Sequence, residues 1–194
     1  MPTERARPTG RRPGESGTRD AIRDAALRLF AEHGYGASVR AIATAAGVDP
    51  GLVRHYYGDK DGLFTTVVAE RLHLAPLLAQ TLAADPEVAA PEFARAYLGI
   101  WEQPAVRPLL LAIVRSATSS SRAAHMLRDM LGTRIRSASG GDPERERRLA
   151  LAGASLMGIA VARHVVGVGP LAEMPYDELV EHVTPAVRGY LAGE

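Results

Sequence analysis

Apolar residues recur along the chain at the spacing of α-helices. On one face of residues 18–33 lie Ile22, Ala26, Leu29 and Phe30. Gly34 follows, and glycine tolerates the left-handed backbone conformation that commonly ends a helix. No stretch alternates apolar and polar residues as half-buried strands do. The pattern therefore predicts an all-α fold.

Two short helices joined by a tight turn follow this first helix. Ser38 is a suitable N-cap for a helix that ends at Gly47, because its hydroxyl can accept a hydrogen bond from a free backbone N–H. Asp49 and Pro50 are typical of the cap and first turn of another helix, which stops at Gly58. The apolar residues carried on this pair are Val39, Ile42, Ala43, Ala46, Leu52, Val53, Tyr56 and Tyr57.

The remaining chain predicts six further helices, which gives about nine in all. Asp59 can cap a long helix that starts at Lys60 and is kinked by Pro76. The expected ranges are residues 60–84, 91–101, 105–117, 120–137, 143–168 and 175–191. We expect an N-terminal three-helix domain over residues 18–60 and a larger helical domain over residues 61–194.

The composition is that of a soluble globular protein, since 46% of the 194 residues are hydrophobic and 23% are charged. The chain has no cysteine, which excludes disulfides, thiolate catalysis and cysteine-ligated zinc. The formal net charge is +1, so any binding to nucleic acid must come from a local group of basic residues.

Basic residues are in excess at the N-terminus. Residues 1–19 carry five arginines and two glutamates, whereas residues 20–60 carry equal numbers of acidic and basic residues. Residues 1–17 are rich in Pro, Gly and Arg and contain no apolar run, which predicts a disordered basic arm of a cytoplasmic protein. The arm either follows DNA or is inert. A transit peptide is disfavoured because no amphipathic stretch is present.

The spacing of small and apolar residues makes the prediction for the two short helices more specific. Ala43 and Gly47 are four positions apart, and Val53 follows six positions later. Two helices that cross closely need a small residue at the crossing, and the turn between them needs a residue that tolerates a left-handed backbone. This is the arrangement of a helix-turn-helix, whose second helix lies in the DNA major groove.

Residues 19–64 resemble the DNA-binding domain of the tetracycline-repressor (TetR/AcrR) family of bacterial regulators. The resemblance is carried by residues 38–43 (SVRAIA), 45–50 (AAGVDP) and 56–64 (YYGDKDGLF). It implies an all-α homodimer in which three N-terminal helices bind DNA. In such regulators a C-terminal helical domain binds a small ligand and dimerises, usually through its last two long helices.

The resemblance and the chemistry of the side chains together select eight residues for DNA binding. They are Ser38, Arg40, Pro50, Gly51, Arg54, His55, Tyr56 and Lys60. Arg40 and Arg54 can bind a phosphate or a guanine edge, and Lys60 can share a phosphate with the N-terminus of its helix. Tyr56, Tyr57 and Arg54 stand where the family usually has His, Phe and Tyr, which makes Arg54 a candidate base reader. The structural alternatives are a solvated charge for Arg40 and a partly buried position for Tyr56.

Large side chains are scarce in the C-terminal region and fall at helical spacing, which favours an adaptable apolar ligand pocket. The candidates are Phe93, Tyr97, Trp101, Met126, Met130 and Met157. Filling of the core is the simpler interpretation for any one of them.

Residues 149–169 form an apolar segment that is long enough to raise the question of a membrane span. Arg163 and His164 interrupt it and its residues are small, so we expect a helix buried in a bundle. Together with the last helix, it predicts a two-fold, four-helix dimer interface. The expected interface residues are Gly153, Leu156, Ala160, His164, Leu179, Val183, Val187 and Tyr190.

Motifs of enzymes are missing from the sequence, which has no Gly-x-Ser-x-Gly, His-Glu-x-x-His or phosphate-binding loop. His125 and Asp129 are one helical turn apart, as are Glu178 and His182. Isolated pairs of this kind are usually surface groups, so we expect neither a metal site nor a cofactor.

These observations favour a ligand-responsive repressor that leaves a palindromic operator when a small molecule binds its C-terminal domain. The expected partners are double-stranded DNA, an unknown small molecule and a second copy of the chain, with no membrane. Two alternatives remain, namely a constitutive DNA-binding regulator and a helical ligand-binding protein or enzyme with a vestigial DNA motif.

Overall fold

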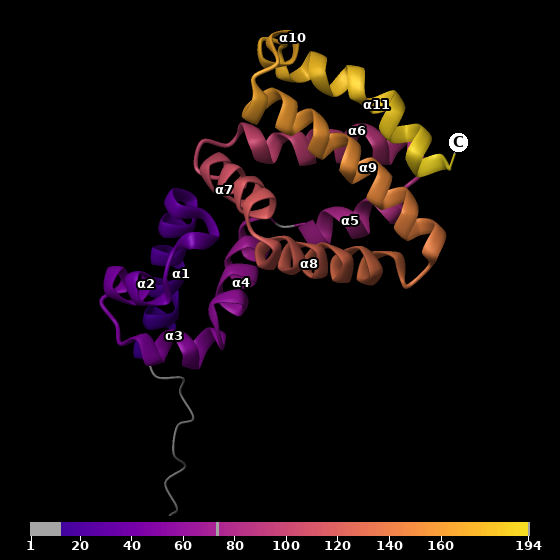
Figure 1. The fold of residues 1–194 in the computed structure, drawn as a ribbon. Helices are drawn as coiled ribbons and strands as arrows, with labels where there is room; N and C mark the ends of the chain where they lie inside the picture. Colours follow the sequence, from indigo (N-terminus) through magenta and orange to yellow (C-terminus); the bar gives the residue numbers. More distant parts are fainter. Residues whose placement is uncertain (1–12, 73, 194) are drawn as a thin grey trace, which may run out of the picture.

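The computed structural model describes residues 13–72 and 74–193, and in these ranges it contains helices and no strands (Figure 1), which confirms the all-α prediction. The N-terminal elements are α1 (Pro13–His33), the 3₁₀ turn η1 (Gly34–Gly36), α2 (Val39–Ala46), α3 (Pro50–Tyr57) and α4 (Lys60–Leu72). The C-terminal elements are α5 (Leu74–Ala83), α6 (Pro86–Glu102), α7 (Arg107–Ser119), α8 (Ser121–Ser139), α9 (Pro143–Val161), the π-helical segment η2 (Ala162–Val166), α10 (Gly169–Ala172) and α11 (Tyr176–Ala192).

The described ranges hold eleven α-helices, where the sequence pattern predicts about nine. The expected helix over residues 60–84 is divided into α4 and α5. Residue 73, which separates these two helices, lies outside the described residues. Figure 1 shows α5 running in a different direction from α4. The other addition is α10, a single turn in the predicted loop before the last helix.

The described part of α1 starts at Pro13, and residues 13–17, which the sequence places in the disordered arm, are helical. Residues 1–12, the rest of the predicted arm, lie outside the described residues.

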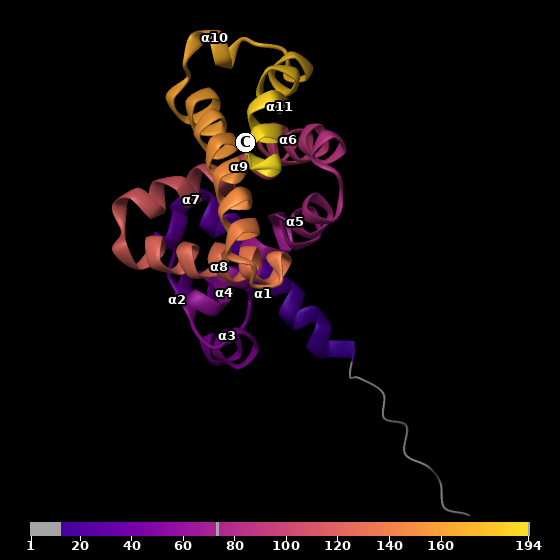
Figure 2. The ribbon, with the colours of Figure 1, turned by 90° about the vertical axis from the view of Figure 1, so that its right-hand side faces the viewer.

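The helices form two groups that α4 joins. Helices α1, α2 and α3 lie together at one end, and α4 leads from them to the larger C-terminal group (Figure 1). There, α8 packs against α5, α7 and α9, and α11 packs along α6 and α9. The turned view shows α9 and α11 side by side (Figure 2).

An aromatic cluster holds α1, η1 and α4 together. The ring of Phe64 is contacted edge-to-face by Phe30 and by Tyr35, with centroid separations of 4.9 and 5.5 Å. The backbone N–H of Tyr35 donates to the hydroxyl of Ser116 at 2.8 Å, which ties η1 to α7. The N-terminal helices and α7 are therefore held against each other through buried contacts.

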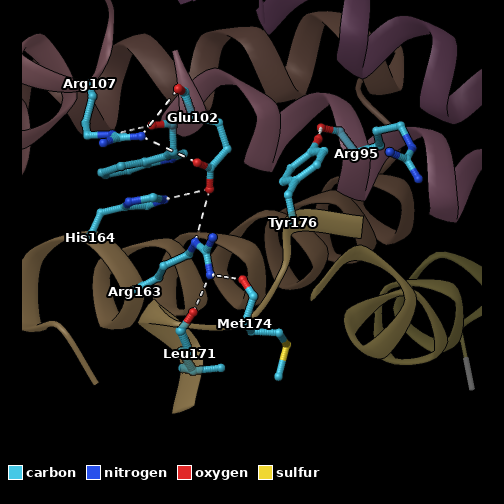
Figure 3. Close-up of polar contacts among 9 residues, drawn as sticks. Arg95, Glu102, Arg107, Arg163, His164, Leu171, Met174 and Tyr176 are labelled. Carbon is cyan, nitrogen blue, oxygen red and sulfur yellow. Dashed lines mark hydrogen bonds and ion pairs between the residues drawn. The ribbon is translucent and has the colours of Figure 1, made fainter. Parts of the chain in front are cut away.

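Glu102, at the end of α6, lies at the centre of a polar cluster (Figure 3). Its Oε1 atom is 3.1 Å from Nε of Arg163 and 3.4 Å from Nε2 of His164, and its Oε2 atom is 3.4 Å from Nη2 of Arg107. Arg163 also donates to the backbone oxygen of Met174 at 2.8 Å. The cluster therefore joins α6 to η2 and to the loop before α11.

The imidazole of His164 stacks on the indole of Trp101, with ring centroids 5.8 Å apart and planes inclined by 6°. The side chain of His164 is 10% exposed. Burial lowers the pKa of His164, an effect to which Arg107 and Arg163 add and which Glu102 opposes. The neutral imidazole is thus the form that the fold favours.

Gly62, in the first turn of α4, has no room for a side chain. An ideal β-carbon there would lie 2.2 Å from the carbonyl oxygen of Tyr57. We expect Gly62→Ala to lower the free energy of unfolding by about 1–3 kcal/mol, because α4 must move away from α3. The control is Gly17→Ala on α1, where a β-carbon meets nothing within 4 Å. This substitution should stabilise the helix, because alanine has a higher helix propensity than glycine. Chemical denaturation measures both, and an unchanged stability for Gly62→Ala would contradict this contact.

The buried imidazole of His164 makes stability depend on pH. Because its pKa is lower in the folded chain, the unfolded chain binds the proton first, and the free energy of unfolding falls as pH drops from about 7.5 to 5.5. We expect a shallower decline for His164→Asn in urea denaturation across this pH range. His182→Asn, on an exposed side chain of α11, is the control and should keep the wild-type slope. Equal slopes in wild type and His164→Asn would rule this linkage out.

Candidate nucleic-acid interface

Helices α2 and α3 cross over small and branched side chains, as the sequence predicts. Ile42, Ala43 and Val53 are buried. Tyr57 is half-buried, and its hydroxyl donates to the backbone oxygen of Arg19 at 2.9 Å. These contacts fix the orientation of α3 against α1 and α2.

Both short helices begin at the predicted caps. The hydroxyl of Ser38 accepts a hydrogen bond from the backbone N–H of Ala41 at 3.1 Å. The carboxylate of Asp49 accepts one from the backbone N–H of Gly51 at 2.7 Å. Gly47 has φ +68°, the left-handed conformation that the turn requires. The helix-turn-helix is therefore confirmed in its local geometry.

The outward face of α3 is free of contacts that would bury it. Its exposed residues are Pro50, Gly51, Leu52, Arg54 and His55. Leu52 is 38% exposed, although the sequence pattern places it among the apolar residues of the pair. Tyr56 is half-buried, and its ring contacts that of His55 with centroids 5.1 Å apart. A short helix with such a free face has the size and polarity to enter a major groove.

Half of the residues predicted to bind DNA line one open cleft of about 620 Å³ between α3 and the start of α4. They are Pro50, Gly51, Arg54 and Lys60. The other four lie outside this lining: Ser38 and Arg40 are exposed near the start of α2, and His55 and Tyr56 lie on α3. Tyr35 and Arg122 also line the cleft, and the sequence analysis missed both.

Lys60 is placed by an aromatic ring. Its Nζ atom lies 4.2 Å from the centroid of Tyr35, within the range of a cation–π interaction. Burial lowers the pKa of Lys60, with Asp61 opposing this effect and Arg122 adding to it. A DNA phosphate at this position would add a negative charge close to the partly desolvated ammonium.

The sequence near Tyr35 contains a signal that could have placed this residue at the cleft, whereas the sequence near Arg122 contains none. Tyr35 follows Gly34, whose φ of +59° turns the chain out of α1, and an aromatic residue at such a turn is a candidate for packing against the next elements. Arg122 lies on α8 and reaches the cleft through tertiary structure alone.

The six residues predicted for a ligand pocket do not share one environment. Phe93 and Trp101 are buried in the core, Trp101 against His164, and burial raises the pKa of Tyr97 to about 12. Met126 and Met130 line an open cleft of about 540 Å³ between α4 and α8. Met157 is 40% exposed on α9, and its part in a ligand pocket stays a prediction.

Five of the eight residues predicted for a dimer interface are buried within the chain itself. They are Leu156, Ala160, Leu179, Val183 and Val187. They fill the contacts of α9 and α11 with each other and with α6 in the single chain. Their place in a dimer interface stays a prediction. His164 belongs to the Glu102 cluster, and Gly153 and Tyr190 are half-buried.

The opposite face of α9 is apolar as well and is exposed. It carries Leu151 and Met157, which are 47% and 40% exposed, and Val165 follows on the same helix run. Because both faces of the helix are apolar, the hydrophobic pattern alone could not tell which one packs inside the chain.

Residues 13–72 and 74–193 contain no group of three or more His, Asp or Glu side chains that could hold a metal ion. The pair His182 and Glu178 forms an exposed contact at 3.7 Å on α11. His125 and Asp129 both line the cleft between α4 and α8.

Comparison with protein families covers both groups of helices. The model described as "Bacterial regulatory proteins, tetR family" matches residues 22–67. The model described as "Tetracyclin repressor-like, C-terminal domain" matches residues 87–191, which is more than half of the chain.

Individual proteins agree with this result. The chain is 33% identical to a TetR-family regulator of Streptomyces coelicolor, whose crystal structure superposes with a TM-score of 0.72 over 94% of this chain and 99% of that one. It is 37% identical over 109 residues, 55% of its length, to the HTH-type transcriptional regulatory protein RaaS of Mycobacterium tuberculosis. It is 44% identical over 63 residues, 32% of its length, to the HTH-type transcriptional repressor AcnR of Corynebacterium efficiens.

The chain spans 48% of RaaS and 32% of AcnR, half or less of these curated relatives. The Streptomyces structure, in contrast, is matched along nearly its whole length. With both family models and the helix-turn-helix geometry in agreement, the chain belongs to the tetR family of bacterial regulators and is a DNA-binding transcriptional regulator, not an enzyme.

Proposed function

We propose that this protein is a ligand-responsive repressor that binds palindromic duplex DNA as a homodimer. One observation carries the DNA-binding part of the proposal: the exposed face of α3 adjoins a cleft lined by Arg54, Lys60 and Arg122. In this proposal α3 enters the major groove and Arg54 contacts base edges, while Lys60 binds a backbone phosphate.

The repressor role is supported by relatives. AcnR of Corynebacterium efficiens is named a transcriptional repressor, and 63 residues of this chain are 44% identical to it. A repressor needs high affinity for its operator in one state and lower affinity in another, which a change in the C-terminal helices can supply.

The exposed apolar face of α9 supports a homodimer in the cytoplasm. The helix over Pro143–Val166 is long and apolar enough to cross a membrane by length and composition, and 22% of its most apolar window is buried within the chain. One helix of this kind is weak evidence for a membrane span. A second copy that covers Leu151, Met157 and Val165 would remove this surface from water. To read half-sites one turn of DNA apart, such a dimer must hold its two copies of α3 about 34 Å apart.

The ligand part of the proposal is supported by the cleft between α4 and α8. Met126 and Met130 provide its adaptable apolar part, and Arg122 and Asp129 provide charged groups. Because α4 leads to the DNA-binding helices, a molecule held between α4 and α8 would favour one orientation of the two groups over another.

A constitutive regulator is the second candidate. The observation that favours it is the core packing of Phe93 and Trp101, two of the large side chains expected to line an enclosed pocket. In that case the C-terminal helices would serve dimerisation alone.

The roles proposed for Arg54 and Lys60 differ in a measurable way. We expect Arg54→Ala to lose about 1–3 kcal/mol of discrimination between operator and unrelated duplexes, because a base contact is removed. Lys60→Ala should weaken binding to all duplexes about equally and flatten the salt dependence, because a phosphate contact is removed. Fluorescence anisotropy with a duplex enriched from random DNA measures both. Unchanged discrimination in Arg54→Ala would exclude Arg54 from base reading.

The proposed dimer face can be tested by placing a charge on it. Met157→Glu should convert the dimer to a monomer, because a carboxylate would be buried without a partner. Sedimentation at micromolar protein measures the change. Val88→Glu, at an exposed apolar position of α6, is the control and should leave the dimer intact. A wild-type monomer, or a dimer that survives Met157→Glu, would contradict the proposed face.

A further inference from the structure

One ion pair connects the start of α4 with α8. Nε and Nη2 of Arg122 donate to Oδ2 of Asp61 at 3.1 and 2.8 Å. The other carboxylate oxygen of Asp61 accepts a hydrogen bond from the hydroxyl of Tyr35. The two oxygens of one carboxylate are thus held from η1 and from α8, across the junction between the two groups of helices.

This ion pair lies beside the proposed phosphate contact. Asp61 follows Lys60 directly. Tyr35 contacts both residues, because its hydroxyl donates to Asp61 and its ring face lies against the ammonium of Lys60. Arg122 lines the same cleft as Lys60, and every other residue of that lining lies between positions 35 and 60. The C-terminal group therefore contributes one cation to the DNA-facing cleft.

The charges explain why Arg122 matters there. Hydrogen bonds from Arg122 and from Tyr35 hold the pKa of Asp61 below its usual range, so the carboxylate is ionised at neutral pH. With Arg122 in place, the negative charge of Asp61 is balanced. Without Arg122, an unbalanced carboxylate would stand next to Lys60 and repel the phosphate that Lys60 binds.

We propose that Arg122 is a positioning residue for DNA binding, which neutralises Asp61 and fixes the start of α4 so that Lys60 can bind a backbone phosphate. The proposal rests on the phosphate contact of Lys60 stated above. In this proposal α8 influences DNA affinity directly. Any movement of α8 that withdraws Arg122 leaves the negative charge of Asp61 without its partner. The cleft that contains Met126 and Met130 is lined by Asp61 and Arg122 too, so an occupant of that cleft would act on this ion pair.

The test is a pair of single variants and their double variant, titrated by anisotropy against a duplex that the wild-type protein enriches from random DNA. We expect Arg122→Ala to weaken binding about tenfold in a dimer, because two copies of Asp61 lose their partner. Asp61→Asn/Arg122→Ala should bind within about twofold to threefold of wild type, because the repelling charge is gone while the amide oxygen still accepts from Tyr35. Arg128→Ala, on an exposed residue of the same helix, is the matched control and should bind as wild type.

Two results would overturn the proposal. One is an Arg122→Ala variant that binds as wild type. The other is a double variant as weak as Arg122→Ala, which would mean that Arg122 contacts DNA directly or acts by general folding. Thermal unfolding of each variant separates the two causes, because only a folding defect lowers the melting temperature.

A second measurement separates this inference from the proposed function. Backbone amide exchange at residues 59–64 should be faster in Arg122→Ala than in wild type and unchanged in Arg128→Ala, since α4 loses its tie to α8. Equal exchange in all three proteins would overturn the positioning role with no DNA present. If wild type enriches no duplex, the proposed function fails, and the exchange result still decides the role of Arg122.

Discussion

The packing of Phe30 and Tyr35 on Phe64 is the constraint on which the DNA-facing surface depends. These three rings lock α1, η1 and the start of α4 into one body. Gly34 makes this packing possible, because it has φ +59° and an added β-carbon would lie 2.5 Å from the hydroxyl oxygen of Ser116. With η1 held in this way, the ring of Tyr35 lies against the ammonium of Lys60, and the hydroxyl of Tyr35 donates a hydrogen bond to Asp61.

The same constraint links DNA binding to the C-terminal helices. Ser116 on α7 accepts a hydrogen bond from Tyr35, and Arg122 on α8 binds Asp61 on α4. The surface proposed to face DNA is therefore assembled from both groups of helices, although the residues proposed to read bases lie on α3. At the other end of the molecule, Glu102 ties α6 to η2 (Figure 3).

The DNA-binding half could be predicted because its signals are local. Ser38 and Asp49 cap their helices by bonding N–H groups two or three residues away, and Gly47 is required by the backbone of the turn itself. Burial of Ala43 and Val53 follows from the same short-range geometry. Such features survive in any tertiary context, so the sequence pattern is sufficient for them.

The C-terminal half depends on long-range choices that the pattern does not encode. Leu156 and Met157 are adjacent apolar residues, yet the first is buried against the chain's own helices and the second is exposed. Trp101 was expected near a ligand, and it instead stacks on His164 from a segment more than sixty residues away. Arg122 has no local signature, because its partner Asp61 lies on a different helix. In each case the outcome is set by which helix packs beside which.

The most direct test of the account is hydroxyl-radical footprinting of an enriched duplex, combined with the stoichiometry of the complex. The account predicts two chains per duplex and two protected segments whose centres lie about one helical turn apart, one for each copy of α3. A single protected segment with one chain bound, or no protection at a concentration where the folded protein is in excess, would contradict it.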